Sequence, residues 1–173
     1  MDENLGRLKV TTANGDIDGD GDYDVIFGYG ARSFSFWTTS GDLYYDSGNS
    51  IAVNTLAINP TRFNDEDGRS DDKGAEPEAV AVLEIKSSIA KLSPASNRFI
   101  LAVAMERTDG VLLYDVTNPT DPVFLTWLQA MGDEAPESLL MIPREDSGND
   151  KALLIVSNED SGTVNIYQNM VTD

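Results

Sequence analysis

The chemistry that this sequence offers is carried by carboxylates, and the most regular group of them lies in residues 16–24. The chain has no His and no Cys, which excludes a Ser-His-Asp triad, a thiol nucleophile and a Cys/His zinc site. In a calcium loop, oxygen ligands recur on alternate residues, a glycine permits a sharp turn, and one residue can offer its backbone carbonyl. This segment supplies such a pattern with Asp16, Asp18, Asp20, Gly21, Asp22 and Asp24. We therefore predict a Ca2+ site here.

The same loop differs from an EF-hand. An EF-hand carries a bidentate Glu at position 12 and is flanked by helices, whereas here that position is Phe27 and the loop leads into an apolar, strand-like run, 25–27. An acidic loop followed by such a run resembles the calcium loops of integrin-type propeller repeats. The alternative is a solvated acidic turn without a metal.

A second acidic segment spans residues 64–74, where the acids have a less regular spacing and stand beside Arg69 and Lys73. Carboxylates, an Asn carbonyl and a tight turn suit Ca2+, but an ion-paired, solvated loop is a serious alternative. The candidate ligands are Asn64, Asp65, Asp67, Asp71 and Asp72.

Composition limits the class of protein. The 173 residues contain 12 Lys and Arg against 30 Asp and Glu, which gives a net charge of −18, and 40% of them are hydrophobic. This length and hydrophobic content predict a single folded domain over residues 1–173, which we interpret as excised from a larger protein. The negative charge argues against nucleic-acid partners. No apolar stretch approaches the roughly 20 residues of a membrane helix, so membrane insertion is not expected.

Short apolar runs separated by turn residues fill most of the chain. They are rich in Val, Ile, Phe and Tyr and too short for typical helices, so they predict strands and an all-β, antiparallel fold. The predicted strands are 8–10, 25–29, 33–37, 43–45, 80–85, 99–105, 111–114, 123–128, 139–142, 152–156 and 163–167. Residues 87–95 and 126–131 are ambiguous between strand, loop and helical turn.

An internal repeat sharpens this prediction. Residues 76–114 and 135–167 share a Pro-Glu before one strand, a second strand ending in Glu, a tight turn and a third strand ending in Tyr. A weaker copy spans 25–37. Repeats of about 40 to 50 residues with several strands each are typical of propeller blades, here about three of them without a closed ring. Equivalent positions of successive blades point to one axis, so we expect a second Ca2+ site at Glu78, Glu106, Glu137 and Glu159; solvated strand ends are the alternative.

The order of these motifs resembles a known family. Segments 5–10, 15–24, 30–37, 69–78, 114–119 and 157–164 are similar to the choice-of-anchor I family of extracellular propeller proteins. Members usually hold a complete propeller. A short form rich in Ca2+ loops resembles the peptide-binding domains of bacterial adhesins of the repeats-in-toxin type, which act in cell adhesion and biofilms.

This resemblance implies a function. It suggests an extracellular, calcium-loaded module on the surface of a bacterium that binds several Ca2+ ions and, without catalysis, captures peptide or protein C-termini of another cell. A bound Ca2+ would meet the ligand carboxylate, with Arg32, Arg107 and Asn158 as further ligand contacts. Two alternatives remain open. One is a Ca2+-dependent phosphoester hydrolase of the phytase type, which needs basic residues such as Arg62, Arg69 and Lys73 at its metal site. The other is a purely structural set of blades.

Overall fold

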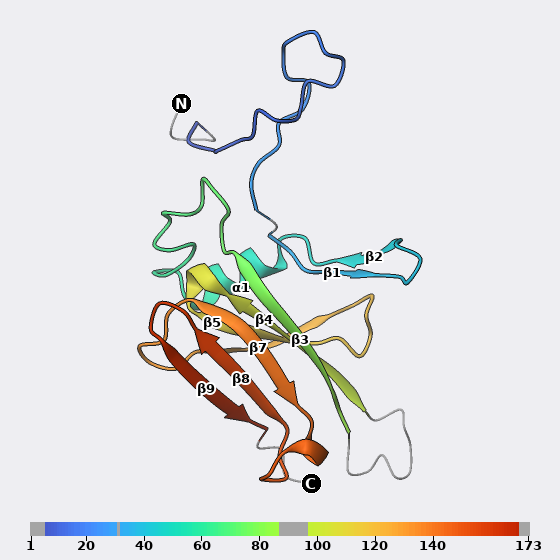
Figure 1. Ribbon diagram of the computed structural model, residues 1–173, viewed down its shortest axis with the longest axis vertical. Helices are drawn as coiled ribbons and strands as arrows, with labels where there is room; N and C mark the ends of the chain where they lie inside the picture. The colour runs from blue at the N-terminus through green and yellow to red at the C-terminus, as the bar shows by residue number, and fades with distance from the viewer. Residues whose placement is uncertain (1–5, 31, 87–96, 170–173) are drawn as a thin grey trace.

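The structure, a computed structural model, describes residues 6–30, 32–86 and 97–169 (Figure 1). Its strands are antiparallel and form three sheets in the described part of the chain. The first sheet holds β1 (Ser35–Trp37) and β2 (Leu43–Asp46), and the second has the order β3 (Pro77–Ile85), β4 (Arg98–Met105), β5 (Gly110–Asp115), β6 (Val123–Leu128). The third has the order β7 (Pro136–Ile142), β8 (Leu153–Asn158), β9 (Thr163–Gln168). The all-β, antiparallel prediction is thereby confirmed, and the sheets do not close into a barrel.

One helix, α1 (Ser50–Ile58), was not expected from the sequence. Its nine residues mix helix formers with β-branched side chains, so local propensity does not decide its conformation. Ile51 and Thr55 lie one turn apart and are fully buried, which ties the helix to the core through tertiary packing. The helix is far shorter than a bilayer is thick, and in the described ranges we find no candidate for a membrane-spanning helix.

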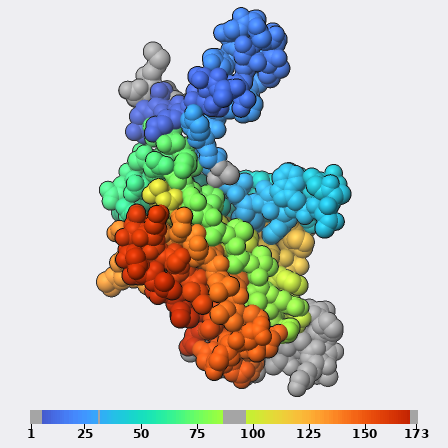
Figure 2. All heavy atoms as spheres, in the orientation of Figure 1, coloured from blue at the N-terminus to red at the C-terminus, as the bar shows by residue number. Residues whose placement is uncertain are grey.

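The segments 8–10 and 25–29 do not form the strands that the sequence predicts. They meet only at a single antiparallel bridge between Val10 and Gly28, and the amide of Thr11 donates to the carbonyl of Phe27 at 3.0 Å. The side chains of Ile26 and Phe27 remain 72% and 44% exposed, so no hydrophobic core stabilises a sheet there. The region instead forms an arm that projects from the body of the molecule (Figures 1 and 2). The ambiguous segment 87–95 lies outside the described residues, and β6 takes in the first part of 126–131.

The sheets stack in layers around two apolar clusters. One face of the β3–β6 sheet contributes Met105, Leu112 and Tyr114, which pack against Phe34, just before β1, and Ile51 of α1; we call β1, β2 and α1 the N-terminal layer. On its other face, a second cluster joins it to the β7–β9 sheet through Ala102, Val111, Leu154 and Val156. Aliphatic side chains from facing sheets therefore bury one another, as in stacked blades.

The internal repeat of the sequence is also present in the structure. A register shift follows Pro77 in β3, and an equivalent one follows Pro136 in β7. The amide of Glu106 donates to the carbonyl of Glu76 at 3.1 Å, and the amide of Glu159 donates to the carbonyl of Ala135 at 2.8 Å. Each bond holds the end of one strand beside the start of its neighbour. The two sheets therefore present their glutamates at equivalent places, with β7 lying against β3.

Candidate metal sites

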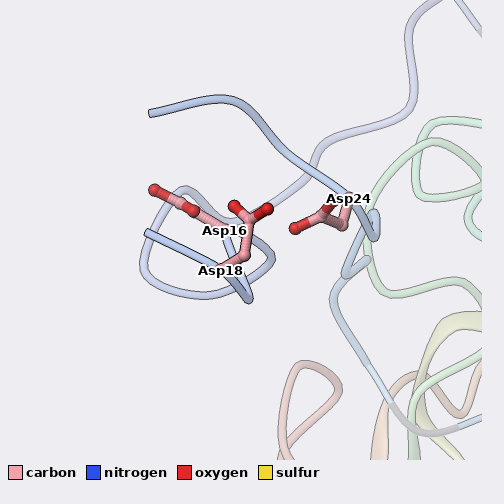
Figure 3. A group of neighbouring side chains, drawn as sticks. All are labelled: Asp16, Asp18 and Asp24. Carbon is pink, nitrogen blue, oxygen red and sulfur yellow. The ribbon is translucent and has the colours of Figure 1, made fainter. Parts of the chain in front are cut away.

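The first candidate site is the Asp16–Asp24 loop at the tip of the N-terminal arm. Ligand oxygens of Asp16, Asp18 and Asp24 lie within 4.8 Å of one another, and Figure 3 shows the Asp24 side chain pointing toward the other two. Two oxygens on opposite sides of a Ca2+ ion are separated by about 4.6–5.2 Å, so this spacing suits that ion. The Asp-Gly pattern therefore brings three hard oxygen donors together, and a Ca2+ ion bound to them stays a prediction.

Backbone hydrogen bonds hold the loop in this shape. The two carboxylate oxygens of Asp16 accept from the amides of Gly19 at 2.7 Å and Gly21 at 3.1 Å. Both glycines have positive φ angles, of 79° and 97°, which residues with a Cβ rarely adopt. At the loop's end, the carboxylate of Asp24 accepts from the amide of Ile17 at 3.0 Å. The glycines thus allow the turns that bring residues 16 and 24 together.

The other two predicted ligands of this loop, Asp20 and Asp22, do not belong to the group of three converging carboxylates. The Asp20 carboxylate accepts from the amide of Asp22 at 3.0 Å, which closes a local turn. Both residues are exposed. The structure thus brings three of the five predicted aspartates together, and participation of the remaining two stays a prediction.

The second candidate site, which we call the glutamate cluster, consists of Glu76, Glu78, Glu106, Glu137 and Glu159. It contains two overlapping groups whose ligand oxygens lie within 4.8 Å of one another. One group is Glu76, Glu78 and Glu106, and the other is Glu106, Glu137 and Glu159. Glu106 belongs to both. The four glutamates that the repeat singles out are therefore neighbours in space, although they come from strands and turns up to 81 residues apart, between 78 and 159.

Charge is distributed unevenly within this cluster. The Glu76 side chain is 2% exposed and is paired with Arg69 at 2.6 Å and Lys73 at 3.3 Å. Burial acts to raise the pKa of Glu76, but hydrogen bonds from these cations and from Glu106 outweigh it, so the pKa is lowered. Glu106 shows the opposite behaviour: burial, together with the neighbouring carboxylate of Glu76, raises its pKa to about 7. A cation bound beside Glu106 would lower this pKa and would keep the carboxyl ionised below pH 7.

A shallow pocket opens beside the glutamate cluster. Its lining is Gly30, Lys73, Glu76, Pro77 and Glu78. Gly30 has a φ of 79°, and a Cβ there would lie 2.7 Å from the carbonyl oxygen of Lys73, so only glycine lets the two segments approach this closely. Glu78 is exposed at this pocket, whereas the Glu76 side chain that lines it is buried.

The second acidic segment is ion-paired. Asp65 lies 3.2 Å from Arg62, Asp67 lies 3.6 Å from Arg7, and Asp72 lies 3.0 Å from Lys9. Among the described residues, neither these acids nor Asp71 belongs to a group of converging carboxylates. Asn64 is buried, its amide nitrogen donates to Ser70, and its carbonyl oxygen has no hydrogen-bond partner. This arrangement matches the ion-paired alternative, and a Ca2+ site in residues 64–74 stays a prediction.

The predicted ligand-contacting residues have different surroundings. The guanidinium of Arg32 donates to the carbonyls of Ser70 and Asp72 at 3.3 and 2.9 Å, so it braces the acidic loop. The guanidinium of Arg107 lies 2.6 Å from the carboxylate of Glu106 and remains 27% exposed. Asn158 is buried and donates to Thr163 at 3.1 Å. Of the three, Arg107 is the one placed directly at the glutamate cluster.

Sequence reasoning overlooked Glu76 as a member of the cluster. It precedes the Pro-Glu of the first repeat, where the second repeat has Ala135, so the repeat itself gave no reason to select it. Its signal is instead local, because Arg69 and Lys73 lie seven and three residues before it and supply its ion pairs. The two basic residues shortly before Glu76 were the available indication.

Comparison with known proteins identifies the family. Gigasin-3a of Magallana gigas is 28% identical to this chain over 192 aligned positions, which cover 94% of the chain and 64% of the relative. The chain thus spans somewhat less than two thirds of that protein's length. No solved structure matches. Residues 1–119 match the family model of the choice-of-anchor I domain, whose description indicates a surface-associated module. With well over half of its length matched, this chain belongs to the choice-of-anchor I domain family.

Proposed function

We propose that this domain is a non-catalytic, Ca2+-dependent binding module that captures the C-terminal carboxylate of a peptide or protein through an ion held at the glutamate cluster. The observation that carries the proposal is the position of Glu106, which completes a carboxylate group with Glu137 and Glu159 from the adjacent sheet. The donors are oxygens only, and the spacing suits Ca2+. A surface-associated family is consistent with such a role.

An ion at this place would keep free coordination positions. Ca2+ takes six to eight oxygen ligands, and this group brings together one carboxylate oxygen each from Glu106, Glu137 and Glu159. Glu137 and Glu159 are exposed, so the positions that they leave open face solvent. A peptide carboxylate is a hard, anionic oxygen donor and is suited to replace water there. Calcium would thereby give a strongly acidic protein an attractive site for an anion.

Arg107 provides a second contact for the same ligand. Its guanidinium lies 2.6 Å from Glu106 and is partly exposed, so a carboxylate bound beside that glutamate would be within reach of it. Arginine offers several N–H donors in a planar arrangement that matches carboxylates. The combination of ion and arginine favours a C-terminal carboxylate over a neutral amide.

The proposal also concerns the setting. We place the module outside the cell, on the surface of a bacterium, with peptide or protein ends of another cell as its ligands, and we include the Asp16–Asp24 loop as a separate, structural Ca2+ site.

A hydrolase of phosphate esters has less support. Each basic residue that it would need is engaged, Arg62 with Asp109 at 2.6 Å and both Arg69 and Lys73 with Glu76.

Calorimetric titration tests the proposal. A pool of hexapeptides with free C-termini is titrated into the protein in 2 mM Ca2+ and in EDTA, and the same pool with amidated C-termini serves as the ligand control. We expect heat of binding only for free carboxylates in Ca2+. The double substitution Glu137→Gln/Glu159→Gln should abolish it, whereas Asp18→Asn, in the distant loop, should not.

Two outcomes would contradict the proposal. If amidated peptides bind equally well, the C-terminal carboxylate is not recognised. If binding persists in EDTA, it does not require the ion. If Ca2+ raises the melting temperature of the protein but neither pool binds, calcium has a structural role only, and the alternative of a purely structural set of blades is preferred.

A further inference from the structure

Asp109 is a buried carboxylate beside the glutamate cluster that belongs to neither group of converging glutamates. It follows Glu106 by three residues, in the tight turn between β4 and β5, and its side chain is 4% exposed. Both of its carboxylate oxygens are used. One accepts from the guanidinium Nε of Arg62 at 2.6 Å, and the other accepts from the backbone amide of Ala135 at 3.2 Å. The second bond therefore joins the β3–β6 sheet to the residue just before β7.

The backbone conformation at this turn does not require an aspartate. Asp109 is left-handed, with a φ of 64°, and the equivalent position of the second repeat is Gly162, with a φ of 63°. Glycine adopts this conformation without steric cost, whereas a residue with a Cβ adopts it at a cost in free energy. What aspartate adds at this place is a pair of acceptor oxygens.

Ala135, the partner of Asp109 across the two sheets, is itself held in a strained conformation. Its φ is 57°, although it stands directly before Pro136, where an extended backbone is favoured. It is 2% exposed, its amide donates to Asp109, and its carbonyl accepts from the amide of Glu159 at 2.8 Å. A strained conformation persists only where the surrounding contacts hold it, and Asp109 supplies one of them.

These contacts connect the three glutamates of the proposed calcium site. Glu106 begins the turn that leads to Asp109. Glu137 lies two residues after Ala135, and Glu159 is hydrogen-bonded to the carbonyl of Ala135. Ligand oxygens of the three glutamates lie within 4.8 Å of one another, although Glu106 comes from one sheet and the other two come from the next. A bond between the two sheets at this point therefore fixes the spacing of the ligands.

We propose that Asp109 is the positioning residue of the glutamate cluster: its carboxylate fixes the two ligands of the β7–β9 sheet at the distance from Glu106 that Ca2+ binding requires. The inference rests on the proposed function, since it concerns the same ion. Asp109 acts through the backbone of Ala135, and the charged hydrogen bond from Arg62 holds its carboxylate in the required orientation. Residues that orient metal ligands in this way affect affinity nearly as strongly as the ligands themselves.

Asparagine cannot replace this carboxylate. It has one acceptor oxygen in place of two, and the charged guanidinium of Arg62 competes for that oxygen more strongly than the amide of Ala135 does. Asp109→Asn should therefore release Ala135. Removal of the competing donor leaves the asparagine oxygen to Ala135, so the double substitution Arg62→Met/Asp109→Asn should restore the position of the ligands. It does so although it also removes the ion pair of Arg62 with Asp65.

A Ca2+ titration followed by backbone amide NMR signals tests the proposal in the 173-residue chain. The signals of Glu137 and Glu159 report the glutamate cluster, and that of Gly21 reports the separate Asp16–Asp24 loop. We expect Asp109→Asn to raise the Kd of the cluster for Ca2+ about tenfold or more and to leave that of the loop unchanged. The double variant should bind Ca2+ at the cluster more tightly than Asp109→Asn, although urea unfolds it more readily.

Asp115→Asn is the matched control. Asp115 also accepts from an arginine, Arg98 at 2.6 Å, and from a backbone amide, that of Thr117 at 2.9 Å, but it lies at the other end of β5. The control should leave the Kd of the cluster unchanged. If Asp109 only stabilises the fold, Ca2+ affinity follows stability across the variants. A double variant that binds no better than Asp109→Asn, or a control with the same loss of affinity, therefore overturns the proposal.

Amide hydrogen exchange of the metal-free wild-type protein does not depend on a variant that folds. In EDTA the amide of Ala135 should be protected, and fast exchange there overturns the positioning contact without reference to calcium. If the wild-type cluster does not respond to Ca2+, the proposed function is contradicted, and the role of Asp109 is overturned with it. If the wild type binds Ca2+ and Asp109→Asn binds it as tightly, the positioning role alone is overturned.

Discussion

Replacing Glu106 by Gln should stabilise the metal-free protein at alkaline pH. In the absence of metal, burial and the carboxylate of Glu76 raise the pKa of Glu106 to about 7, against 4.5 in an unfolded chain. The folded protein therefore binds a proton that the unfolded protein has released at intermediate pH. Glutamine resembles the protonated carboxyl in shape and in hydrogen bonding to Glu76, but it does not ionise.

The magnitude follows from linkage. A folded pKa above the unfolded one contributes stability that is present below pH 4.5 and is lost as the pH rises through about 7. A difference of 7 − 4.5 = 2.5 units corresponds to at most about 3.4 kcal/mol. Because Glu76 and Arg107 respond to the ionisation of Glu106, we expect about 1–3 kcal/mol. For a domain of this size, the melting temperature of Glu106→Gln relative to wild type should therefore be roughly 3–9 °C higher at pH 8 than at pH 5.

Thermal unfolding in EDTA at pH 5, 6, 7 and 8 measures this effect. Glu134→Gln is the control for the loss of one negative charge, since Glu134 is exposed and outside the glutamate cluster. Saturating Ca2+ should then stabilise the wild-type protein at pH 8 but raise the melting temperature of Glu106→Gln much less, because the variant lacks the shared ligand.

Two results would refute this reasoning. If the difference between Glu106→Gln and wild type is the same at pH 5 and pH 8, Glu106 does not titrate abnormally in the folded state. If Glu134→Gln produces the same pH-dependent gain, the effect comes from the overall charge of the chain rather than from the glutamate cluster.

Three further predictions follow from individual contacts. Gly110→Ala places a Cβ 2.2 Å from Trp127, so the free energy of unfolding, measured with denaturant, should fall by about 2–4 kcal/mol. For the control Gly148→Ala, where nothing lies within 4 Å of the added Cβ, it should fall by less than about 1 kcal/mol. Glu76→Gln removes the buried negative charge that is paired with Arg69 and Lys73, so the free energy of unfolding in urea should fall by about 2–4 kcal/mol. Asp24→Asn should weaken terbium binding to the loop at least about tenfold, measured by luminescence, with the main unfolding transition unchanged because the arm projects from the core.

The strands of the two repeats could be read from the sequence. Between residues 77 and 168, runs of Val, Ile and Leu bounded by Gly, Pro, Asn and Asp specified each strand to within a few residues. The repeat also indicated which glutamates become neighbours, because equivalent positions of stacked sheets lie side by side. The Asp-Gly spacing likewise predicted the turn that gathers Asp16, Asp18 and Asp24.

Only the tertiary structure decided the rest, because it depended on burial. Ile51 and Thr55 lie in α1 since a core pocket receives one helical face, whereas the strand-like run 25–29 stays irregular since no core receives it. The Glu76 carboxylate became the buried partner of Arg69 and Lys73, and burial, together with this carboxylate, raises the pKa of Glu106. Local spacing determines turns and strand ends, but burial and charge pairing depend on residues distant in the chain, which no local pattern records.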